Sequence, residues 1–248
     1  MTLQKTKKIN KFVILIAILN CFLSVSRTRA QTLPIPPNLI DLGTAQGQNL
    51  LLETKYKQDF FLLSMQFVTQ VNQTYCGVAS MVMVLNSLQI PAPLAPEYKP
   101  YHLFTQNNFF DNQETRKIIK PELVSRQGMN LSQLAELLKI YQVKVDKYYS
   151  SEITLEKFRK IVIESFKHSD NYIIVNYLRS AIGEKTGGHF SPLGAYNEQS
   201  DRFLILDVSR YKYPSVWVKT IDLWRAINTI DSSAGKTRGF VVISKIKN

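Results

Sequence analysis

QVNQTYCG at residues 70–77 runs directly into VASMVMVLNSL at residues 78–88, and the junction between these two stretches decides how the chain folds. A polar loop ends at Cys76, and the apolar run behind it predicts a helix that begins at or beside the cysteine. Unpaired backbone N–H groups and the positive end of a helix dipole stabilise an anion at such a position. The thiol of Cys76 is therefore expected to favour the thiolate, which is its nucleophilic form. The alternative is that Cys76 is a small buried hydrophobe, as most cysteines are.

Length and composition exclude several classes of protein. The chain has 248 residues and is 45% hydrophobic, which is enough for one large domain or two closely joined lobes. The net charge is +12, but six of these positive charges lie before residue 31, which leaves +6 for the remainder. That remainder is dispersed, without a long basic run or a nucleic-acid-binding motif. It indicates a solvated, mildly basic surface and no nucleic-acid partner.

The first thirty residues have the pattern of an export signal. Lysines at residues 5–11 precede a nearly apolar stretch at residues 12–25, and cleavage is expected before Gln31. The pattern predicts an exported protein, either periplasmic or associated with a membrane through this segment alone, because the apolar run is short for a membrane span. An uncleaved anchor and a lipidated Cys21 are alternatives, and the protein would be cytoplasmic if the segment is not functional. Removal of residues 1–30 would leave Cys76 as the one cysteine, without a disulfide partner.

Periodicity predicts an α+β fold. Prolines and glycines predict an extended leading segment at residues 31–48, and four prolines exclude regular structure at residues 91–100. Helices are expected at 113–126, broken or started by Pro121, and at 131–141, 155–166 and 222–228; strands are expected at 143–149, 172–178, 189–196, 203–208, 216–218 and 240–244. Helices therefore gather in the first two-thirds and strands in the last third. This order predicts a helical lobe followed by an antiparallel β lobe, with a site in the cleft between them.

Three histidines are candidates for the partner of Cys76. His102 lies in the proline-rich region and His168 in a polar link, so both are expected to be exposed bystanders. His189 follows two glycines and opens a strand, where a backbone or a substrate can approach closely and the imidazole is held rigidly. The alternative for His189 is a histidine of the core whose hydrogen bonds are satisfied.

A carboxylate and an amide complete the candidate site. Asp207 follows four apolar strand residues, so it is expected to be partly buried and to need a partner such as an imidazolium. Cys76, His189 and Asp207 then form a nucleophile, its base and the group that orients the base. Gln70 is a candidate oxyanion-hole donor beside the N–H of Cys76, or alternatively only a loop residue.

Several separate stretches of the sequence resemble a known protein family. The stretches at 70–77, 93–97 with 103–106, 187–192 and 206–214 together resemble phytochelatin synthases, specifically the short bacterial form. The resemblance covers about residues 50–245. It implies a papain-like cysteine protease fold, with residues 31–248 as a single catalytic domain of two lobes, and it supports the triad.

The family resemblance implies glutathione as substrate and a glutathione γ-glutamylcysteinyltransferase activity. Cys76 would attack the bond between cysteine and glycine, release glycine and keep a γ-glutamylcysteinyl thioester. Asp231 and Arg238 are similar to the residues that hold the γ-glutamyl head, with Asn176 and Gly188 as further substrate contacts. A zwitterionic head suits an acid and a guanidinium.

The chain also departs from the plant-type pattern. It ends at Asn248 without the cysteine-rich extension, so hydrolysis of the acyl-enzyme is expected to be the major outcome and transfer to a second glutathione the minor one. No resident metal is predicted, because one cysteine and three scattered histidines lack ligand spacing. Cadmium or zinc ions would act through glutathione thiolates, in heavy-metal detoxification or glutathione turnover. The resemblance further implies a homodimer.

Two other functions remain open at this point. One is a papain-like peptidase that processes exported peptides, which would share the triad and differ in the pocket. The other is a non-enzymatic metal-binding protein, for which a single cysteine is a poor thiolate cluster.

Overall fold

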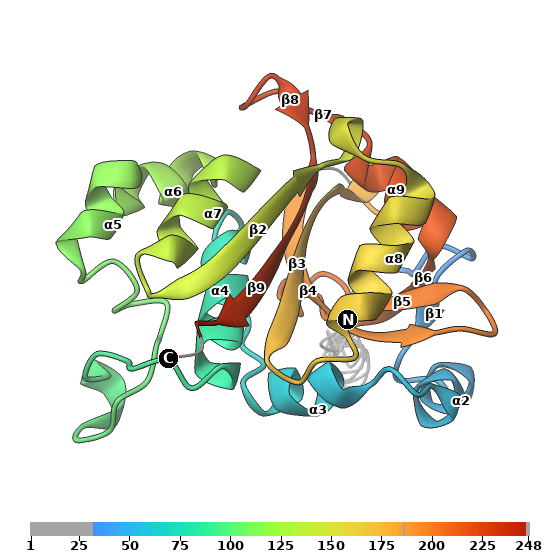
Figure 1. Ribbon diagram of the computed structural model, residues 1–248, viewed down its shortest axis with the longest axis horizontal. Helices are drawn as coiled ribbons and strands as arrows, with labels where there is room; N and C mark the ends of the chain where they lie inside the picture. The colour runs from blue at the N-terminus through green and yellow to red at the C-terminus, as the bar shows by residue number, and fades with distance from the viewer. Residues whose placement is uncertain (1–31, 186, 247–248) are drawn as a thin grey trace, which may run out of the picture. The chain divides into compact units, whose positions relative to one another are not determined.

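A seven-stranded antiparallel sheet is the centre of the computed structural model, which describes residues 32–185 and 187–246 (Figure 1). The order of the strands across the sheet is β1-β6-β5-β4-β3-β9-β2. They are β1 (Ile40–Asp41), β2 (Val143–Tyr149), β3 (Asn171–Leu178), β4 (Gly188–Asn197), β5 (Arg202–Ile205), β6 (Val216–Lys219) and β9 (Gly239–Lys245). A separate two-stranded ribbon joins β7 (Ile230–Asp231) to β8 (Lys236–Thr237).

Helices cover both faces of the sheet. They are α2 (Ala45–Glu53), α3 (Gln58–Met65), α4 (Cys76–Ser87), α5 (Gln113–Ile118), α6 (Pro121–Gln127), α7 (Leu131–Lys139), α8 (Leu155–Ser165) and α9 (Thr220–Ile227), with 3₁₀ turns η1 (Pro96–Tyr98), η2 (Ser150–Glu152) and η3 (Arg179–Ile182). Helices α4 and α7 contact β4 and β2 on one face, while α8 and α9 contact β3 on the other (Figure 1). The sheet is therefore buried on both sides.

Strand β3 shows how the sequence produces these two layers. Tyr172 and Ile174 belong to the apolar cluster under α4 and α7, whereas Ile173, Val175 and Tyr177 belong to the cluster under α8 and α9. Successive strand side chains point to opposite faces, so a strand that is covered on both sides reads as one continuous apolar run.

Most of the expected elements are confirmed. Helix α4 begins at Cys76, strand β2 has the predicted bounds, and Pro121 opens α6 after α5 has ended. Asn130 caps α7 by accepting a hydrogen bond from the N–H of Gln133 at 3.0 Å, the stabilising contact expected of an N-cap. The α+β class is confirmed as well.

One expectation was wrong in detail, and three short strands were missed. The segment 31–48 is not extended throughout, because α2 begins at Ala45, where the hydroxyl of Thr44 accepts a hydrogen bond from the N–H of Gly47 at 3.1 Å. Helices gather in the first two-thirds of the described chain and most strands in the last third, as expected, and the exceptions are β1, β2 and α9. The short strands β1, β7 and β8 were missed, being too short for a periodic pattern.

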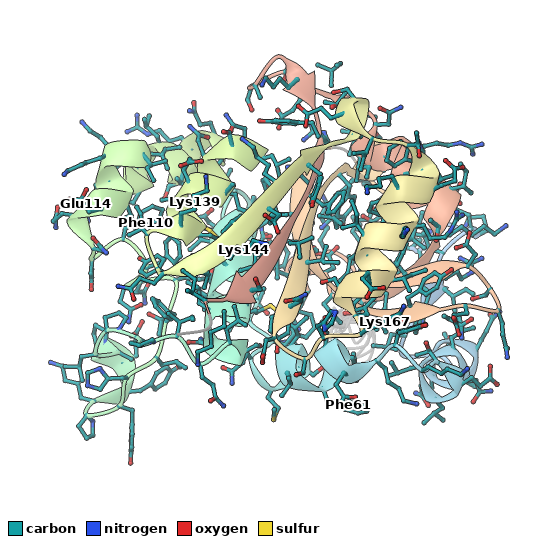
Figure 2. All side chains as sticks on the ribbon, viewed as in Figure 1. Phe61, Phe110, Glu114, Lys139, Lys144 and Lys167 are labelled. Carbon is teal, nitrogen blue, oxygen red and sulfur yellow. The ribbon has the colours of Figure 1, made fainter. Side chains whose placement is uncertain are left out.

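Many charged side chains away from the cavity lie at the surface. Figure 2 shows Glu114 on α5, Lys139 on α7 and Lys144 on β2, and their side chains are 58%, 51% and 64% exposed. Each forms an exposed ion pair with a near neighbour in sequence, and such pairs contribute about 0–1 kcal/mol. This arrangement agrees with a solvated, mildly basic surface.

The described residues after Gln31 belong to one compact unit. Within them, none of the helices has the length and apolar content that crossing a membrane requires. The predicted export signal at residues 1–30, with Cys21, lies outside the described residues.

Candidate active site

Cys76 is the first residue of α4 and lines a small cavity. No side chain caps the helix at Tyr75, so the N–H groups of the first turn remain available to an anion. The thiol is buried, and it is the free cysteine among the described residues. The cavity has a volume of about 250 Å³ and is lined from the helical side by Cys76 and residues 127–129 and from the sheet side by Asn176, Gly188 and Phe190.

His189 and Asp207 meet on the sheet as predicted. His189 is the second residue of β4, and Asp207 follows the neighbouring strand β5. The Nε2 atom of His189 lies 2.9 Å from Oδ1 of Asp207, and both side chains are almost fully buried. The N–H of Ser209 also donates to Oδ1 of Asp207, at 2.7 Å. With Nε2 held by the carboxylate, Nδ1 is the ring nitrogen left to exchange a proton with Cys76.

The electrostatics favour an ion pair between Cys76 and His189. Burial alone would raise the pKa of the Cys76 thiol, but the charge of His189, a hydrogen bond from it, a backbone hydrogen bond at Phe190 and, least, the charge of Arg179 lower that pKa overall. Burial alone would lower the pKa of His189, yet Asp207 and the Cys76 thiolate raise it above its ordinary value. A thiol whose pKa falls beside an imidazole whose pKa rises is the arrangement of an activated cysteine nucleophile.

Two charged residues behind the triad were not identified from the sequence. The guanidinium of Arg179 lies 2.7 Å from Oδ2 of Asp207 and also pairs with Glu184, and all three side chains are nearly inaccessible to solvent. Burial, opposed by Arg179, leaves the pKa of Glu184 above its usual range. The signal was present, because Arg179 directly follows the apolar strand NYIIVNYL, just as Asp207 follows FLIL.

Gln70 is buried near the site, but its amide is engaged elsewhere. Its Nε2 donates to the carbonyl of Asn72 at 2.7 Å and to the hydroxyl of Tyr211 at 3.1 Å, while its Oε1 has no partner among the described residues. For Gln70 to stabilise an oxyanion, one of these two bonds must open. Its role as an oxyanion-hole donor therefore stays a prediction, and Tyr211 is a neighbour that sequence reasoning missed.

Asp231, Arg238 and Asn176 form a charged end of the cavity. Nη1 of Arg238 donates to Oδ1 of Asn176 at 3.0 Å and lies 3.3 Å from Oδ2 of Asp231. The other oxygen of Asp231 accepts bonds from the N–H and the hydroxyl of Ser233. Nε of Arg238 is buried and has no partner within the described part of the chain. A carboxylate and a guanidinium with a free donor can together bind a zwitterion.

Gly188 makes room for this pair. A Cβ atom at Gly188 would lie 2.9 Å from Cζ of Arg238, closer than side chains normally approach. The predicted substrate contact at Gly188 is therefore placed against Arg238. The absence of a side chain at this position keeps the guanidinium on the cavity wall.

The remaining histidines lie away from the triad. His102 is exposed, and its Nδ1 lies 3.0 Å from the carbonyl of Ala92. The side chain of His168 is 61% exposed and lies 3.7 Å from Glu164. Across residues 32–185 and 187–246, no three His, Cys, Asp or Glu side chains gather as a metal site would require.

Sequence comparison connects this geometry to known proteins. Residues 30–240 match the family model described as phytochelatin synthase. Glutathione γ-glutamylcysteinyltransferase 3 of Lotus japonicus is 37% identical over 220 residues, which are 88% of this chain and 44% of the relative. Glutathione γ-glutamylcysteinyltransferase 1 of Arabidopsis thaliana is 36% identical over 218 residues, which are 87% of this chain and 43% of the relative. The glutathione γ-glutamylcysteinyltransferase of Schizosaccharomyces pombe is 26% identical over 217 residues, which are 84% of this chain and 50% of the relative. The chain spans about half the length of the curated relatives it matches.

Solved structures show more distant likenesses. A double glycine motif protease from an AMS/PCAT transporter superposes with a TM-score of 0.42 at 16% identity, over 72% of this chain and 90% of that chain. The cysteine protease interpain A of Prevotella intermedia gives a TM-score of 0.37 at 12% identity, over 70% and 83%.

Proposed function

The chain belongs to the phytochelatin synthase family, and from this membership and the geometry of the site we propose that it is a glutathione γ-glutamylcysteinyltransferase. One observation carries the proposal. Cys76, the nucleophile of the Cys76–His189–Asp207 triad, lines the same cavity as the Asp231–Arg238 pair, so a nucleophile and a receptor for a zwitterion share one cavity.

The first half of the reaction is acylation of Cys76. The thiolate attacks the carbonyl carbon between cysteine and glycine of glutathione, and the carbonyl oxygen becomes an oxyanion beside the N–H groups at the start of α4. The imidazolium of His189 then gives its proton to the glycine nitrogen. The C–N bond breaks, glycine leaves, and a γ-glutamylcysteinyl thioester remains on Cys76. Asp207 holds His189 in the orientation that this transfer needs.

The charged end of the cavity binds the γ-glutamyl head. In the free protein Arg238 and Asp231 face each other at 3.3 Å. The α-amine of the substrate would bind Asp231 and its α-carboxylate would bind Arg238, including the buried Nε that now has no partner. This arrangement favours the γ-linked peptide, because an α-linked glutamate would present its amine and carboxylate in a different geometry.

We further propose that water takes most of the acyl-enzyme. The cavity of about 250 Å³ is smaller than the roughly 300–1,000 Å³ of typical ligand pockets, so it suits one acyl unit. Transfer to the amine of a second glutathione requires that amine to be held in a fixed orientation, which is what raises its effective concentration above that of water. Hydrolysis to γ-glutamylcysteine is the major outcome and phytochelatin the minor one.

Metal enters this scheme as part of the substrate. Cadmium or zinc would be carried by glutathione thiolates, so that metal-glutathione complexes are substrates or acceptors, and no resident cofactor is required. The physiological role would be heavy-metal detoxification or glutathione turnover.

The cellular setting is proposed from the sequence. The basic and apolar pattern of residues 1–30 supports export to the periplasm, with any membrane association through that segment. A homodimer is proposed from the family resemblance.

The product distribution tests the proposed function. The protein is incubated with millimolar glutathione, with and without cadmium, and glycine, γ-glutamylcysteine and the two-unit phytochelatin are quantified by mass spectrometry. Each acylation releases one glycine, so glycine should equal the sum of γ-glutamylcysteine and the two-unit phytochelatin, with γ-glutamylcysteine the larger of the two. Equal cleavage of an α-linked Glu-Cys-Gly peptide would instead favour a processing peptidase, and phytochelatin in excess of γ-glutamylcysteine would show a productive acceptor site.

A further inference from the structure

A buried group of charges next to the triad, centred on Arg179, has no part in the proposed reaction. Arg179 is 2% exposed and directly follows β3. Its guanidinium contacts Asp207 on one side and Glu184 on the other. Burying an arginine and two carboxylates away from water costs desolvation free energy unless each charge is paired. The pairing compensates for this cost, and we ask what the three charges do for the site.

The same two residues close the loop that leads into His189. The N–H of Glu184 donates to the carbonyl of Arg179 at 3.1 Å, and the N–H of Arg179 donates to the carbonyl of Gly187 at 3.0 Å. Tyr213 adds its ring 5.2 Å from the guanidinium, and its hydroxyl accepts from the N–H of Lys185. Nη2 of Arg179 is thereby held against both carboxylate oxygens of Asp207, 2.7 Å from Oδ2 and 2.9 Å from Oδ1, the oxygen that His189 also contacts.

The surroundings contain few other charges. The groups that face Arg179 are Asp207 after β5, Glu184 after η3, His189 on β4, Cys76 on α4, Tyr177 on β3 and Tyr213 in the loop before β6. Burial raises the pKa of Tyr177 well above its ordinary value, so it stays neutral. Helix α9 packs against η3 through apolar side chains, and its Asp222 and Arg225 pair with each other at 3.5 Å. The leading segment meets η3 through Asn38, which is uncharged.

We propose that Arg179 and Glu184 form a positioning pair that sets the pH range in which the Cys76 thiolate and the His189 imidazolium coexist. Arg179 places a positive charge behind Asp207, and Glu184 both holds this guanidinium and offsets part of its charge. The proposal rests on the proposed use of Cys76 as a nucleophile, and it adds two residues that touch neither the substrate nor the reacting atoms.

Removing the charge of Arg179 has a definite sign. A positive charge near the site stabilises the thiolate and destabilises the imidazolium. The Arg179→Gln variant loses this charge, so the pKa of Cys76 and the pKa of His189 both rise. The pH at which Cys76 becomes reactive should move upward by about one unit.

Removing the charge of Glu184 has the opposite sign. In the Glu184→Gln variant the guanidinium of Arg179 is no longer offset, so the thiolate gains stability and the imidazolium loses it. The pH at which Cys76 becomes reactive should move downward, by about half a unit or more. A purely structural role for the pair would not produce shifts in opposite directions.

The experiment measures the rate at which iodoacetamide alkylates Cys76 as a function of pH in the full chain. Mass spectrometry of the peptide that contains Cys76 keeps Cys21 out of the measurement. Arg179→Lys retains the charge and should lie closer to the wild type than Arg179→Gln. Glu136→Gln removes an exposed acid that pairs with Lys139 on α7 and should leave the profile unchanged.

Opposite shifts in Arg179→Gln and Glu184→Gln support the proposal, and any other combination overturns it. A profile of Arg179→Lys as displaced as that of Arg179→Gln also overturns it, because charge would then not be the cause. If Arg179→Gln does not fold, as judged by circular dichroism, the direction in Glu184→Gln decides alone. Alkylation does not involve glutathione, so a failure of glutathione cleavage in the wild type would count against the proposed function and not against this pair.

Discussion

Cys76 and His189 stabilise each other's charged form, although both are buried. The carboxylate of Asp207 lies 2.9 Å from the imidazole, and Nη2 of Arg179 lies 2.7 Å and 2.9 Å from the two oxygens of that carboxylate. Burial disfavours every charge here, so the site depends on close pairing. The chemistry of the protein therefore depends on the ionisation of these few side chains.

The pH dependence follows from the directions of these pKa shifts. The acid limb of kcat/KM is expected to reflect formation of the Cys76 thiolate, whose pKa is lowered, and the alkaline limb to reflect loss of the His189 proton, whose pKa is raised. Asp207→Asn removes the charge that stabilises the imidazolium, so the pKa of His189 falls and the alkaline limb should move to lower pH by about 1–3 units. Steady-state glutathione cleavage between pH 5 and pH 10 tests this, and an unchanged alkaline limb would contradict it.

Arg238 is expected to contribute mainly to substrate recognition. Removing one member of a desolvated charge pair costs about 2–5 kcal/mol in comparable interfaces, so Arg238→Ala should lower kcat/KM for glutathione about tenfold or more. Arg238→Lys should rescue little, because the fork of donors is lost. Arg225→Ala, which removes an exposed arginine from α9, is the matched control and should retain activity. Equal kcat/KM values in Arg238→Ala and Arg225→Ala would show that Arg238 does not contribute to substrate recognition.

At the level of elements, strand β4 carries the residue proposed as catalytic base and one proposed for substrate recognition at adjacent positions. Gly188 lies against Arg238, and His189 reaches Asp207. Strand β3 adds Asn176 from the neighbouring position, since it pairs with Phe190 of β4 and with Gly239 of β9. Regular pairing of these strands thus fixes the catalytic base and the recognition end of the cavity relative to each other.

Gly188→Ala tests this arrangement. The new methyl group would lie 2.9 Å from Cζ of Arg238, so the guanidinium must move while the strand itself is retained. We expect kcat/KM to fall by about the same factor as in Arg238→Ala. The kcat/KM of the double variant should be little lower than that of either single variant, because the effects of substituting two residues in contact are not additive. Full additivity in the double-mutant cycle would show that Gly188 acts independently of Arg238.

Helices and strands could be predicted from the sequence where an apolar pattern extends over many residues. The triad could be predicted because its residues lie at the ends of such helices and strands. Helix α4 was predicted from the long apolar run that follows a polar loop, and strand β2 from the alternation of its residues. His189 was predicted because it follows two glycines and opens a strand, and Asp207 because it follows four apolar strand residues. The pairing of Arg179 with Glu184 and the hydrogen bonds of Gln70 could not be predicted, because they depend on a loop closing in three dimensions. The assignment of Asp231 and Arg238 came from family resemblance, since in isolation both read as solvated charges.

At the scale of the whole molecule, one buried acid links folding stability to pH. Asp59 on α3 is fully buried, and neither of its carboxylate oxygens has a partner among the described residues. Desolvation raises the pKa of Asp59 to about 8. The folded state therefore keeps a proton that the unfolded chain releases near pH 4.

The free energy of unfolding should fall as the pH rises from about 4 to about 8, by at most about 1.4 kcal/mol per pH unit from this residue. The sign follows because the native state binds more protons than the unfolded state in this window. Asp59→Asn should flatten the dependence, whereas Asp146→Asn, which removes an exposed acid from β2, should leave it unchanged. Urea unfolding at pH 5.5 and pH 7.5 measures the change in the free energy of unfolding between these two pH values. An equal change in the wild type and in Asp59→Asn would refute the role of Asp59.

The proposed function depends above all on acylation of Cys76 by glutathione. The most direct measurement is the intact mass of the full chain after brief incubation with glutathione and an acid quench, followed by peptide mapping. We predict a mass increase equal to one γ-glutamylcysteinyl group on Cys76 in the wild type, with glycine released, and neither product in a folded Cys76→Ser variant. Glutathione turnover by Cys76→Ser at a rate near that of the wild type, or an acyl group mapped to another residue, would contradict the account.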